Sequence, residues 1–342
     1  MPLVGLFQRA VNPILCSIVE CVVIFSPLKI CFGKIYIMKN TSLPKLELER
    51  ILSLAQLPGL PQSAVRILEI SQDPANGPAE FAVPIEADLG LTGQILRFVN
   101  SSYFGFGREI SNIKMAICMV GIRTIKNFIL WTALYSLMAN PKCGPFYLNS
   151  LWQDSLRRAL FARDFAKLLG MKDAEDVFTA ALLQDMAIPI LAKELPHLYV
   201  KLLESRERRQ IRLSLLENQE FGWTHAQAAS MMARHWNFPD ELINLIENHT
   251  AIDQFADKPE EAPDKVTVAM SALLPTIVDP VWTECQQFEL YYEKFVPSNN
   301  PAIVELLDHI DNEYDLLAPI LKLPIPAKLL VDCYNEVTVS TK

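Results

Sequence analysis

Among the carboxylates and imidazoles in the middle of the chain that have the chemistry of metal ligands are Asp154, Asp185, His225 and His249. Carboxylates and imidazoles that converge on a metal ion polarise a phosphate ester and generate hydroxide at neutral pH. Such an ion could be held by three or four of these groups, since Asp154 can coordinate through oxygen. The alternative is that Asp185 is a partly buried charge that pairs with His225, His249 or a nearby arginine.

A second group of residues could bind phosphate or an acidic partner. It is the densest basic cluster in the chain, with members Arg206, Arg208, Arg209 and Arg212. Guanidinium groups bind phosphate and carboxylate through paired hydrogen bonds. Glu204 and Glu207 are interleaved with the arginines, which favours a solvated helix face. Binding of a phosphate-containing ligand or an acidic partner is the functional alternative.

The loop 100–107, Asn-Ser-Ser-Tyr-Phe-Gly-Phe-Gly, is rich in aromatic residues and glycine. We expect a tight connection in which Asn100 caps and the glycines supply positive φ angles. Tyr103 and Phe104 would then fill the helical bundle, as aromatic side chains at helix joints commonly do. A recognition role for Tyr103 is the alternative.

Composition and periodicity predict the elements that must position these side chains. The 342 residues suffice for two or three compact units, and 51% of them are hydrophobic. Apolar residues recur at helical spacing, without convincing period-two alternation. An all-α fold follows. Helices are expected over residues 46–55, 62–71, 79–87, 91–100, 112–120, 122–138, 150–170, 198–221, 224–236 and 239–248, and within 266–342.

Several boundaries follow from capping residues. Ser111 is the expected N-cap of the helix at 112–120, and Gly121 closes it. Ser150 begins a Ser-x-x-Gln capping box. Asp173 caps the next helix, which is expected to carry Gln184 and Asp185 and to break near residue 189. The acidic, proline-containing segment 255–265 is a candidate linker.

The net charge and the cysteine content limit the partners and the cellular location that we expect. A net charge of −8 gives no general electrostatic drive toward nucleic acid. The helix after Gly121 is too apolar to lie in a major groove, so we expect no nucleic-acid partner. The seven cysteines are odd in number and form no C-x-x-C pair. They indicate a reducing, cytoplasmic location rather than a secreted disulfide framework or a zinc knuckle.

The first 37 residues differ from the rest. Residues 13–25 form an apolar run that is short for a membrane span and lacks a clear signal-peptide cleavage site. Three interpretations compete: a weak membrane anchor, an unusual or uncleaved signal, and a reading frame begun too far upstream. We favour the last, with Met38 as the true start, and expect no firm membrane association.

Two segments together resemble the HDOD family, the HD-related output domains of bacterial signalling proteins. The first is Leu-Pro-Gly-Leu-Pro at 57–61, followed by Ala64, Leu68 and the Asp-Pro turn at 73–74; the second is Leu-Arg-Phe-Val-Asn-Ser-Ser-Tyr-Phe-Gly at 96–105, then Ile110 and the pairs at 116–117 and 121–122. Further matches lie at 151–152, 180–185, 221–222, 225–226 and 236–239. They run in family order over about residues 45–250.

The resemblance implies a multi-helix HDOD fold, in which an N-terminal helical bundle packs on a degenerate HD-phosphohydrolase-like bundle. We expect an apolar leader at 1–37, the N-terminal helical subdomain at 38–149, the HD-like subdomain at 150–254 and a helical C-terminal region at 255–342.

The resemblance also implies that the metal site is vestigial. Gln184 occupies the position of the histidine in the His-Asp dyad, and its amide oxygen is a poor substitute for imidazole. Asp154 stands at the upstream histidine, and Met270 or Ser271 at the late aspartate. Asp185, His225 and His249 remain. We therefore expect no catalytic residue, no bound metal and no cofactor.

The expected function is non-catalytic: a signal-transduction or regulatory module that binds a signalling protein partner. Two alternatives stay open. One is a metal-dependent phosphohydrolase with a degenerate site made of Asp154, Asp185, His225 and His249. The other is a nucleotide sensor that uses the vestigial cavity.

Overall fold

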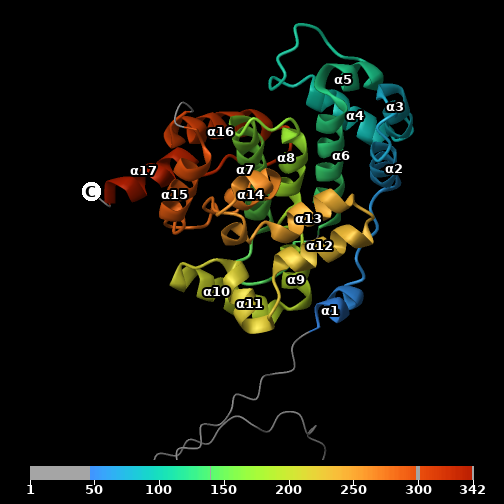
Figure 1. Ribbon diagram of the computed structural model, residues 1–342. Coiled ribbons are helices and arrows are strands. Elements are labelled where there is room, and N and C mark those ends of the chain that lie inside the picture. The colour runs from blue at the N-terminus through green and yellow to red at the C-terminus, as the bar shows by residue number, and fades with distance from the viewer. Residues whose placement is uncertain (1–46, 139, 298–300, 341–342) are drawn as a thin grey trace, which may run out of the picture. The chain divides into compact units, whose positions relative to one another are not determined.

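The computed structural model describes residues 47–138, 140–297 and 301–340 (Figure 1). All of them belong to one compact unit, residues 44–342. Within these ranges all regular structure is helical, which confirms the all-α prediction. The leader expected at 1–37 lies outside the described residues. Among the described helices, none combines the length and the apolar character that a membrane crossing requires.

The helices form three consecutive groups along the chain. The first group is α1 (Leu48–Leu54), α2 (Gln62–Ser71), α3 (Pro78–Glu86), α4 (Leu89–Val99), α5 (Ile113–Val120) and α6 (Ile122–Leu137). The second is α7 (Leu148–Leu168), α8 (Ala174–Leu183), α9 (Ile188–Glu194), α10 (Pro196–Arg209), α11 (Leu213–Phe221), α12 (His225–His235) and α13 (Asp240–Asn248). The third is the short 3-10 helices η1 (Ile252–Gln254) and η2 (Pro259–Glu261), then α14 (Pro263–Ser271), α15 (Cys285–Phe295), α16 (Ile303–Leu317) and α17 (Leu330–Ser340).

Helix α7 is the centre of the molecule. Every residue from Leu151 to Ala166 is buried, and the helix packs against α8, α14 and α16. A helix buried on all sides must find partners for its polar side chains, because an unpaired buried polar group is costly. Several of those side chains are charged, and their partners define the candidate site described below.

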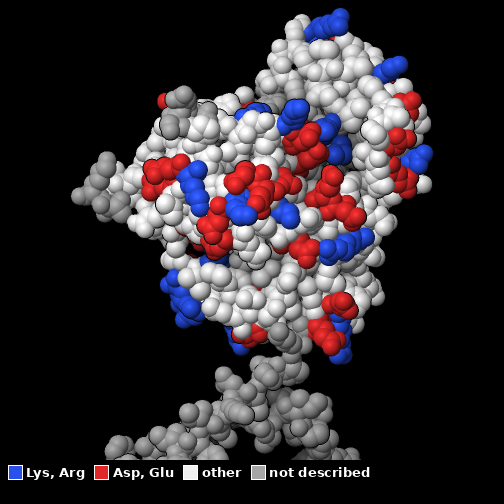
Figure 2. All heavy atoms as spheres, viewed as in Figure 1, with Lys and Arg blue, Asp and Glu red and all other residues white. Residues whose placement is uncertain are grey.

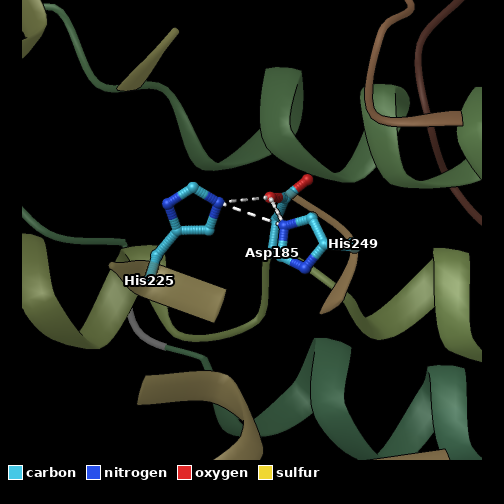
Figure 3. Close-up of side chains that lie close together, drawn as sticks. All are labelled: Asp185, His225 and His249. Atoms are coloured by element: carbon cyan, nitrogen blue, oxygen red, sulfur yellow. Dashed lines mark hydrogen bonds and ion pairs between the residues drawn. The ribbon is translucent and has the colours of Figure 1, made fainter. Parts of the chain in front are cut away.

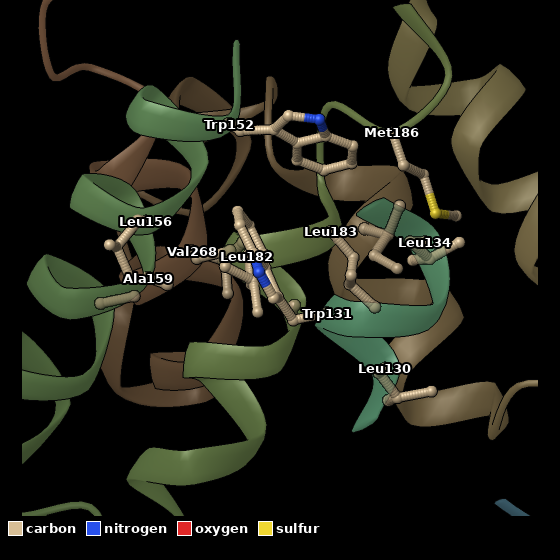
Figure 4. Close-up of a cluster of buried hydrophobic side chains, with 14 of the residues drawn as sticks. Leu130, Trp131, Leu134, Trp152, Leu156, Ala159, Leu182, Leu183, Met186 and Val268 are labelled. Carbon is tan, nitrogen blue, oxygen red and sulfur yellow. The ribbon is translucent and has the colours of Figure 1, made fainter. Parts of the chain in front are cut away.

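An aromatic cluster joins the first group of helices to α7 and α8 (Figure 4). Trp131 of α6 meets Trp152 of α7 edge-on, with ring centroids 5.1 Å apart. Leu182 and Leu183 of α8 are buried in the same cluster. Edge-to-face contact of large rings adds stability beyond the buried area, so this cluster holds α6, α7 and α8 in a defined register.

The loop between α4 and α5 is closed by the side chain of Asn100. Its Nδ2 donates to the Ile110 carbonyl at 2.8 Å, and the Ile110 amide donates to its Oδ1 at 2.7 Å. Phe104 packs edge-on against Phe98, with centroids 5.0 Å apart, and Gly105 takes a φ of 60°. The loop is therefore a tight connection whose ends are joined by one amide side chain.

Several expected boundaries were wrong, and the single helix expected at 198–221 is two helices, α10 and α11. Asn112, and not Ser111, caps α5, because its Oδ1 accepts the Met115 amide at 2.8 Å. Ser150 lies inside the first turn of α7, which begins at Leu148. Helix α8 ends at Leu183, so Asp185 lies in the turn before α9 and not on a helix. Proline at 189 falls in the first turn of α9, where its missing N–H needs no partner.

Buried side chains of α7 bind the C-terminal region, residues 255–342, through hydrogen bonds and an ion pair. Gln153 donates its amide to the Pro324 carbonyl at 2.9 Å. Arg157 donates to the Lys328 carbonyl and lies 3.7 Å from the Asp311 carboxylate. The expected linker at 255–265 instead holds η2 and the start of α14, which packs on α7. A buried helix and two buried polar side chains thus tie this region to the centre of the fold.

Candidate functional site

Asp185, His225 and His249 come together in the interior, as Figure 3 shows. Asp185 lies in the turn after α8, His225 is the first residue of α12, and His249 directly follows α13. Their exposed fractions are only 3%, 5% and 1%, so a charge on any of them needs a partner inside the protein. We call these three residues the trio.

The facing atoms of the trio are Oδ1 of Asp185 and Nε2 of both histidines. Oδ1 lies 3.3 Å from Nε2 of His225 and 3.6 Å from Nε2 of His249. The two Nε2 atoms are 3.2 Å apart. Three potential donor atoms therefore surround one point.

The outer nitrogens of both histidine rings have fixed partners. Nδ1 of His225 lies 2.6 Å from Oε2 of Glu217, whose other oxygen accepts the Tyr199 hydroxyl at 2.6 Å. Nδ1 of His249 lies 2.7 Å from the Ile246 carbonyl, which can only accept. Nδ1 of His249 therefore carries a proton, and both rings are held with Nε2 toward Asp185.

A cation from the chain itself lies against the trio. Arg158 of α7 donates through Nη1 to Oδ2 of Asp185, and both side chains are buried. Asp154, one helical turn before Arg158, accepts the Ile277 amide on Oδ1 at 2.8 Å. Residues four apart share one face of a helix, so both point to the same side of α7.

Burial and neighbouring charges set the protonation states. Burial would lower the pKa of His225, but Glu217 and Asp185 outweigh it and raise that pKa to about 10. Burial lowers the pKa of His249, so its ring is neutral. Burial would raise the pKa of Asp185, yet Arg158 and the two histidines hold it well below its usual range. Burial raises the pKa of Asp154 to about 7.

The side chain of Gln184 contacts Ser271 of α14. It is fully buried, and its Oε1 lies 3.3 Å from the Ser271 hydroxyl, which also donates to the Val268 carbonyl at 2.6 Å. Its Nε2 is buried without a hydrogen-bond partner. Met270 beside Ser271 is fully buried as well. The resemblance puts the dyad histidine at Gln184 and the late aspartate at Met270 or Ser271. In the structure, the amide of Gln184 and the hydroxyl of Ser271 contact each other.

A cavity of about 150 Å³ opens beside the trio. Its polar wall includes Asp154, Arg158, Asp185, Arg206, Arg212, His225 and His249. Arg206 pairs with Asp279 at 2.7 Å, and Arg212 lies 3.4 Å from Glu284. Each arginine of the wall therefore already has a carboxylate from the same chain.

The basic cluster divides in two. Arg206 and Arg212 are partly buried in ion pairs at the cavity, whereas Arg208 and Arg209 are exposed on α10. On the face seen in Figure 2, acidic and basic side chains are interspersed rather than separated by sign. Only the exposed pair remains available for a partner.

Tyr103 lies apart from the trio, with its hydroxyl in an internal network. It accepts from Nη1 of Arg163 at 3.0 Å and donates to Oε1 of Glu313 at 3.3 Å. Arg163 also contacts Oε2 of Glu313. The tyrosine therefore joins the loop of the first helical group to α7 and α16.

A family model for the HDOD domain matches residues 57–252, more than half of the chain. The chain belongs to the HDOD family. This finding confirms the resemblance seen in the sequence motifs.

One relative of the HDOD chain is an uncharacterized protein of Treponema pallidum (strain Nichols). The two are 26% identical over 196 residues, which are 56% of this chain and 37% of the relative. The matched part therefore spans little more than a third of the curated relative.

Solved structures share the HDOD fold. An HDOD domain protein of unknown function from Geobacter sulfurreducens has a TM-score of 0.56 at 21% identity, over 86% of this chain and 96% of that one. A proposed signal transduction protein from Marinobacter aquaeolei VT8 has a TM-score of 0.61 at 20% identity, covering 82% and 63%. A proposed metal-dependent phosphohydrolase from Shewanella amazonensis SB2B has a TM-score of 0.55 at 16% identity, covering 80% and 97%. At these identities the likeness shows the fold alone.

The HD-related fold implies a metal, and the trio fits one only in part. Its donor atoms converge, but a guanidinium contacts Asp185 and the carboxylates beside His225 favour an imidazolium. A divalent cation would have to displace the proton on Nε2 of His225 and would lie beside the positive charge of Arg158, in a medium of low dielectric constant. The charges do not fit a metal, and we derive no chemical step through one.

Sequence reasoning missed Arg158 and Glu217, the two residues that set the charge of this site. A signal for Arg158 was present, because it follows Asp154 by four residues on a predicted helix. Glu217 was placed on a helix with no apparent role. Only the packing of α11 against α12 brings its carboxylate to the His225 ring.

Proposed function

We propose that the chain is a non-catalytic regulatory module that acts by binding a signalling protein. The observation that carries the proposal is the buried contact between Arg158 and Asp185. Through this contact Arg158 supplies a permanent positive charge beside the Asp185 carboxylate, because a guanidinium keeps its proton at any physiological pH.

Charge balance at the site supports this assignment. Arg158 and the His225 imidazolium carry two positive charges, and Asp185 and Glu217 carry two negative charges. Buried charges persist when they are paired and hydrogen-bonded. The site is thus complete without an ion from solution.

The cavity argues against a nucleotide sensor. Small-molecule sites usually measure about 300–1,000 Å³, whereas this cavity measures about 150 Å³. Phosphate recognition needs free cations, and Arg158, Arg206 and Arg212 each already have a carboxylate partner.

The first experiment tests for catalysis and sensing. The full chain, purified without chelator, is assayed for Mn, Fe, Mg and Zn by mass spectrometry and for hydrolysis of cyclic dinucleotides. Nucleotides are also screened by thermal shift, since a ligand that binds only the folded state raises Tm. We expect less than about a tenth of an equivalent of metal, no turnover and no shift. Stoichiometric metal with turnover would show that the chain is an enzyme.

The second experiment tests the partner. Proteins are crosslinked to the chain in its source cell, and the affinity of the recovered partner is measured for the variant Arg208→Glu/Arg209→Glu. The variant Lys193→Glu/Lys201→Glu, which reverses two charges on α9 and α10, is the matched control. We expect weaker binding for the arginine variant alone. Equal affinity for both variants would show that Arg208 and Arg209 are not part of the interface.

A further inference from the structure

We infer that the trio is a latent single-metal site, and that the charge of Arg158 on the other oxygen of Asp185 prevents a metal ion from binding there. The inference rests on the proposed function and deepens it, because it names the residue that excludes the ion. It assigns the latent site to a borderline transition metal such as Co²⁺ or Zn²⁺, for which two imidazoles and one carboxylate are suitable ligands.

The spacing of the trio matches a tetrahedral coordination shell. Zinc binds imidazole nitrogen and carboxylate oxygen at about 2.0–2.2 Å, so neighbouring ligand atoms of a tetrahedral shell are about 3.3–3.6 Å apart. The three observed separations are 3.2, 3.3 and 3.6 Å. The donor atoms are therefore already at the distances that one ion requires.

The orientation of the rings matches as well. Metal-binding histidines commonly donate their outer ring N–H to a carboxylate or a backbone carbonyl, which fixes the inner nitrogen toward the metal. Here Nδ1 of His225 meets Glu217 at 2.6 Å, and Nδ1 of His249 meets the Ile246 carbonyl at 2.7 Å. These two partners thus aim both Nε2 atoms inward.

The feature that closes the site is the guanidinium of Arg158. Helix α7 carries it into the interior on the same face as Asp154, and it contacts the oxygen of Asp185 that faces away from the histidines. Its charge cannot be removed by a change of pH. A divalent ion bound to Oδ1 of the same carboxylate would lie one carboxyl group away from that charge, in a site with little solvent to screen it.

The test removes the charge of Arg158 and measures metal binding. The full-length variant Arg158→Gln is titrated with Co²⁺, whose visible absorption reports its coordination geometry, and then with Zn²⁺ as competitor. All proteins carry His309→Ala, because the group Asp164, His309 and Glu313, of which only His309 is exposed, could also bind a metal ion. We expect one equivalent of tetrahedral Co²⁺ in the variant, bound at least ~100-fold more tightly than in the parent protein.

Two controls isolate the trio. Arg206→Gln removes an arginine from the same cavity wall and should leave Co²⁺ binding at the parent level. Arg158→Gln combined with His249→Gln should lose the gained site. If Arg158→Gln does not fold, as judged by circular dichroism, Arg158→Met is used, because its unbranched side chain retains more of the apolar contact.

The outcomes separate this inference from the proposed function. Weak binding by the parent and by every folded Arg158 variant would overturn the latent site and leave the regulatory role intact. Tight binding already in the parent would overturn the latent site and would also remove the charge argument for a non-catalytic module. Gain of Co²⁺ that survives His249→Gln would place the ion elsewhere and overturn the inference.

Discussion

Glu217 contacts His225 twice: its Oε2 lies 2.6 Å from Nδ1 of the ring and accepts the backbone amide of the same residue at 2.8 Å. Glu217 is fully buried, and its other oxygen accepts the Tyr199 hydroxyl. One carboxylate thus caps the first residue of α12, orients the ring and balances its charge.

Replacement of Glu217 by Gln should destabilise the protein. An amide keeps the shape but leaves the imidazolium short of one counter-charge, and loss of one partner of a buried ion pair costs about 3 kcal/mol. Urea denaturation measures the change in the free energy of unfolding. Glu220→Gln, on the exposed side of the same helix α11, is the matched control and should change it by less than about 0.5 kcal/mol. Equal effects of the two changes would contradict a paired charge at Glu217.

The pKa of His225 predicts a loss of stability on the alkaline side. Its value in the folded protein, about 10, lies above the ordinary 6.5, so the folded state holds an extra proton between these limits. The resulting stabilisation is complete below pH 6.5 and is lost as pH rises through 10. Urea midpoints measured from pH 6 to pH 10 should fall for the wild type and fall less for Glu217→Gln. Parallel curves would show that Glu217 does not set this pKa.

Asp154 predicts a second pH dependence in a lower window. Its pKa rises from 3.8 to about 7 on folding, so the folded state again binds the extra proton, here at acid pH. Stability therefore declines as pH rises from 3.8 to about 7 and is constant above that. Asp154→Asn keeps the oxygen that accepts the Ile277 amide and cannot ionise. It should be more stable than wild type by about 4 kcal/mol at pH 8 and nearly equal to it at pH 4. A variant less stable at both pH values would refute this account.

Replacement by Met should have opposite effects on the free energy of unfolding at two buried glutamines, Gln184 and Gln153. Gln184 has a buried Nε2 without a hydrogen-bond partner, whereas Gln153 donates to the Pro324 carbonyl at 2.9 Å. Gln184→Met removes an unsatisfied group and should be neutral or stabilising by about 1 kcal/mol. Gln153→Met leaves a carbonyl with one fewer donor and should cost about 1–2 kcal/mol. Thermal and urea unfolding of both variants give the comparison, and the same sign for both would contradict it.

The Tyr103 hydroxyl should contribute to stability. It accepts from Arg163 and donates to Glu313, and hydrogen bonds to charged groups are worth about 1.5–3 kcal/mol each. Arg163 and Glu313 stay paired with each other in Tyr103→Phe, so the variant should cost about 2 kcal/mol rather than the sum of both bonds, and it should increase amide hydrogen exchange in α16. Tyr147→Phe, at a 63% exposed position, is the control. Unchanged stability with loss of a partner would instead support the recognition role considered for Tyr103.

The sequence alone determined much of the fold. Helical periodicity predicted most of the helices, because the side of a helix that faces the core is recorded in the spacing of its apolar residues. Motifs such as Asn-Ser-Ser-Tyr-Phe-Gly at 100–105 indicated the HDOD family. The amide at Gln184, where the resemblance implies an imidazole, led us to predict a changed metal site. These are local properties of the chain, so no packing information was needed to find them.

Only the tertiary structure decided which charges meet. Arg158 and Asp185 are 27 residues apart, Arg206 and Asp279 are 73 apart, and their contacts depend on how α7, α8 and α10 pack. Periodicity tells which face of a helix is buried, but it does not tell which side chain of another element reaches that face. The sequence therefore predicted a metal site with missing ligands, and the packing of α7 revealed the cation that lies beside Asp185.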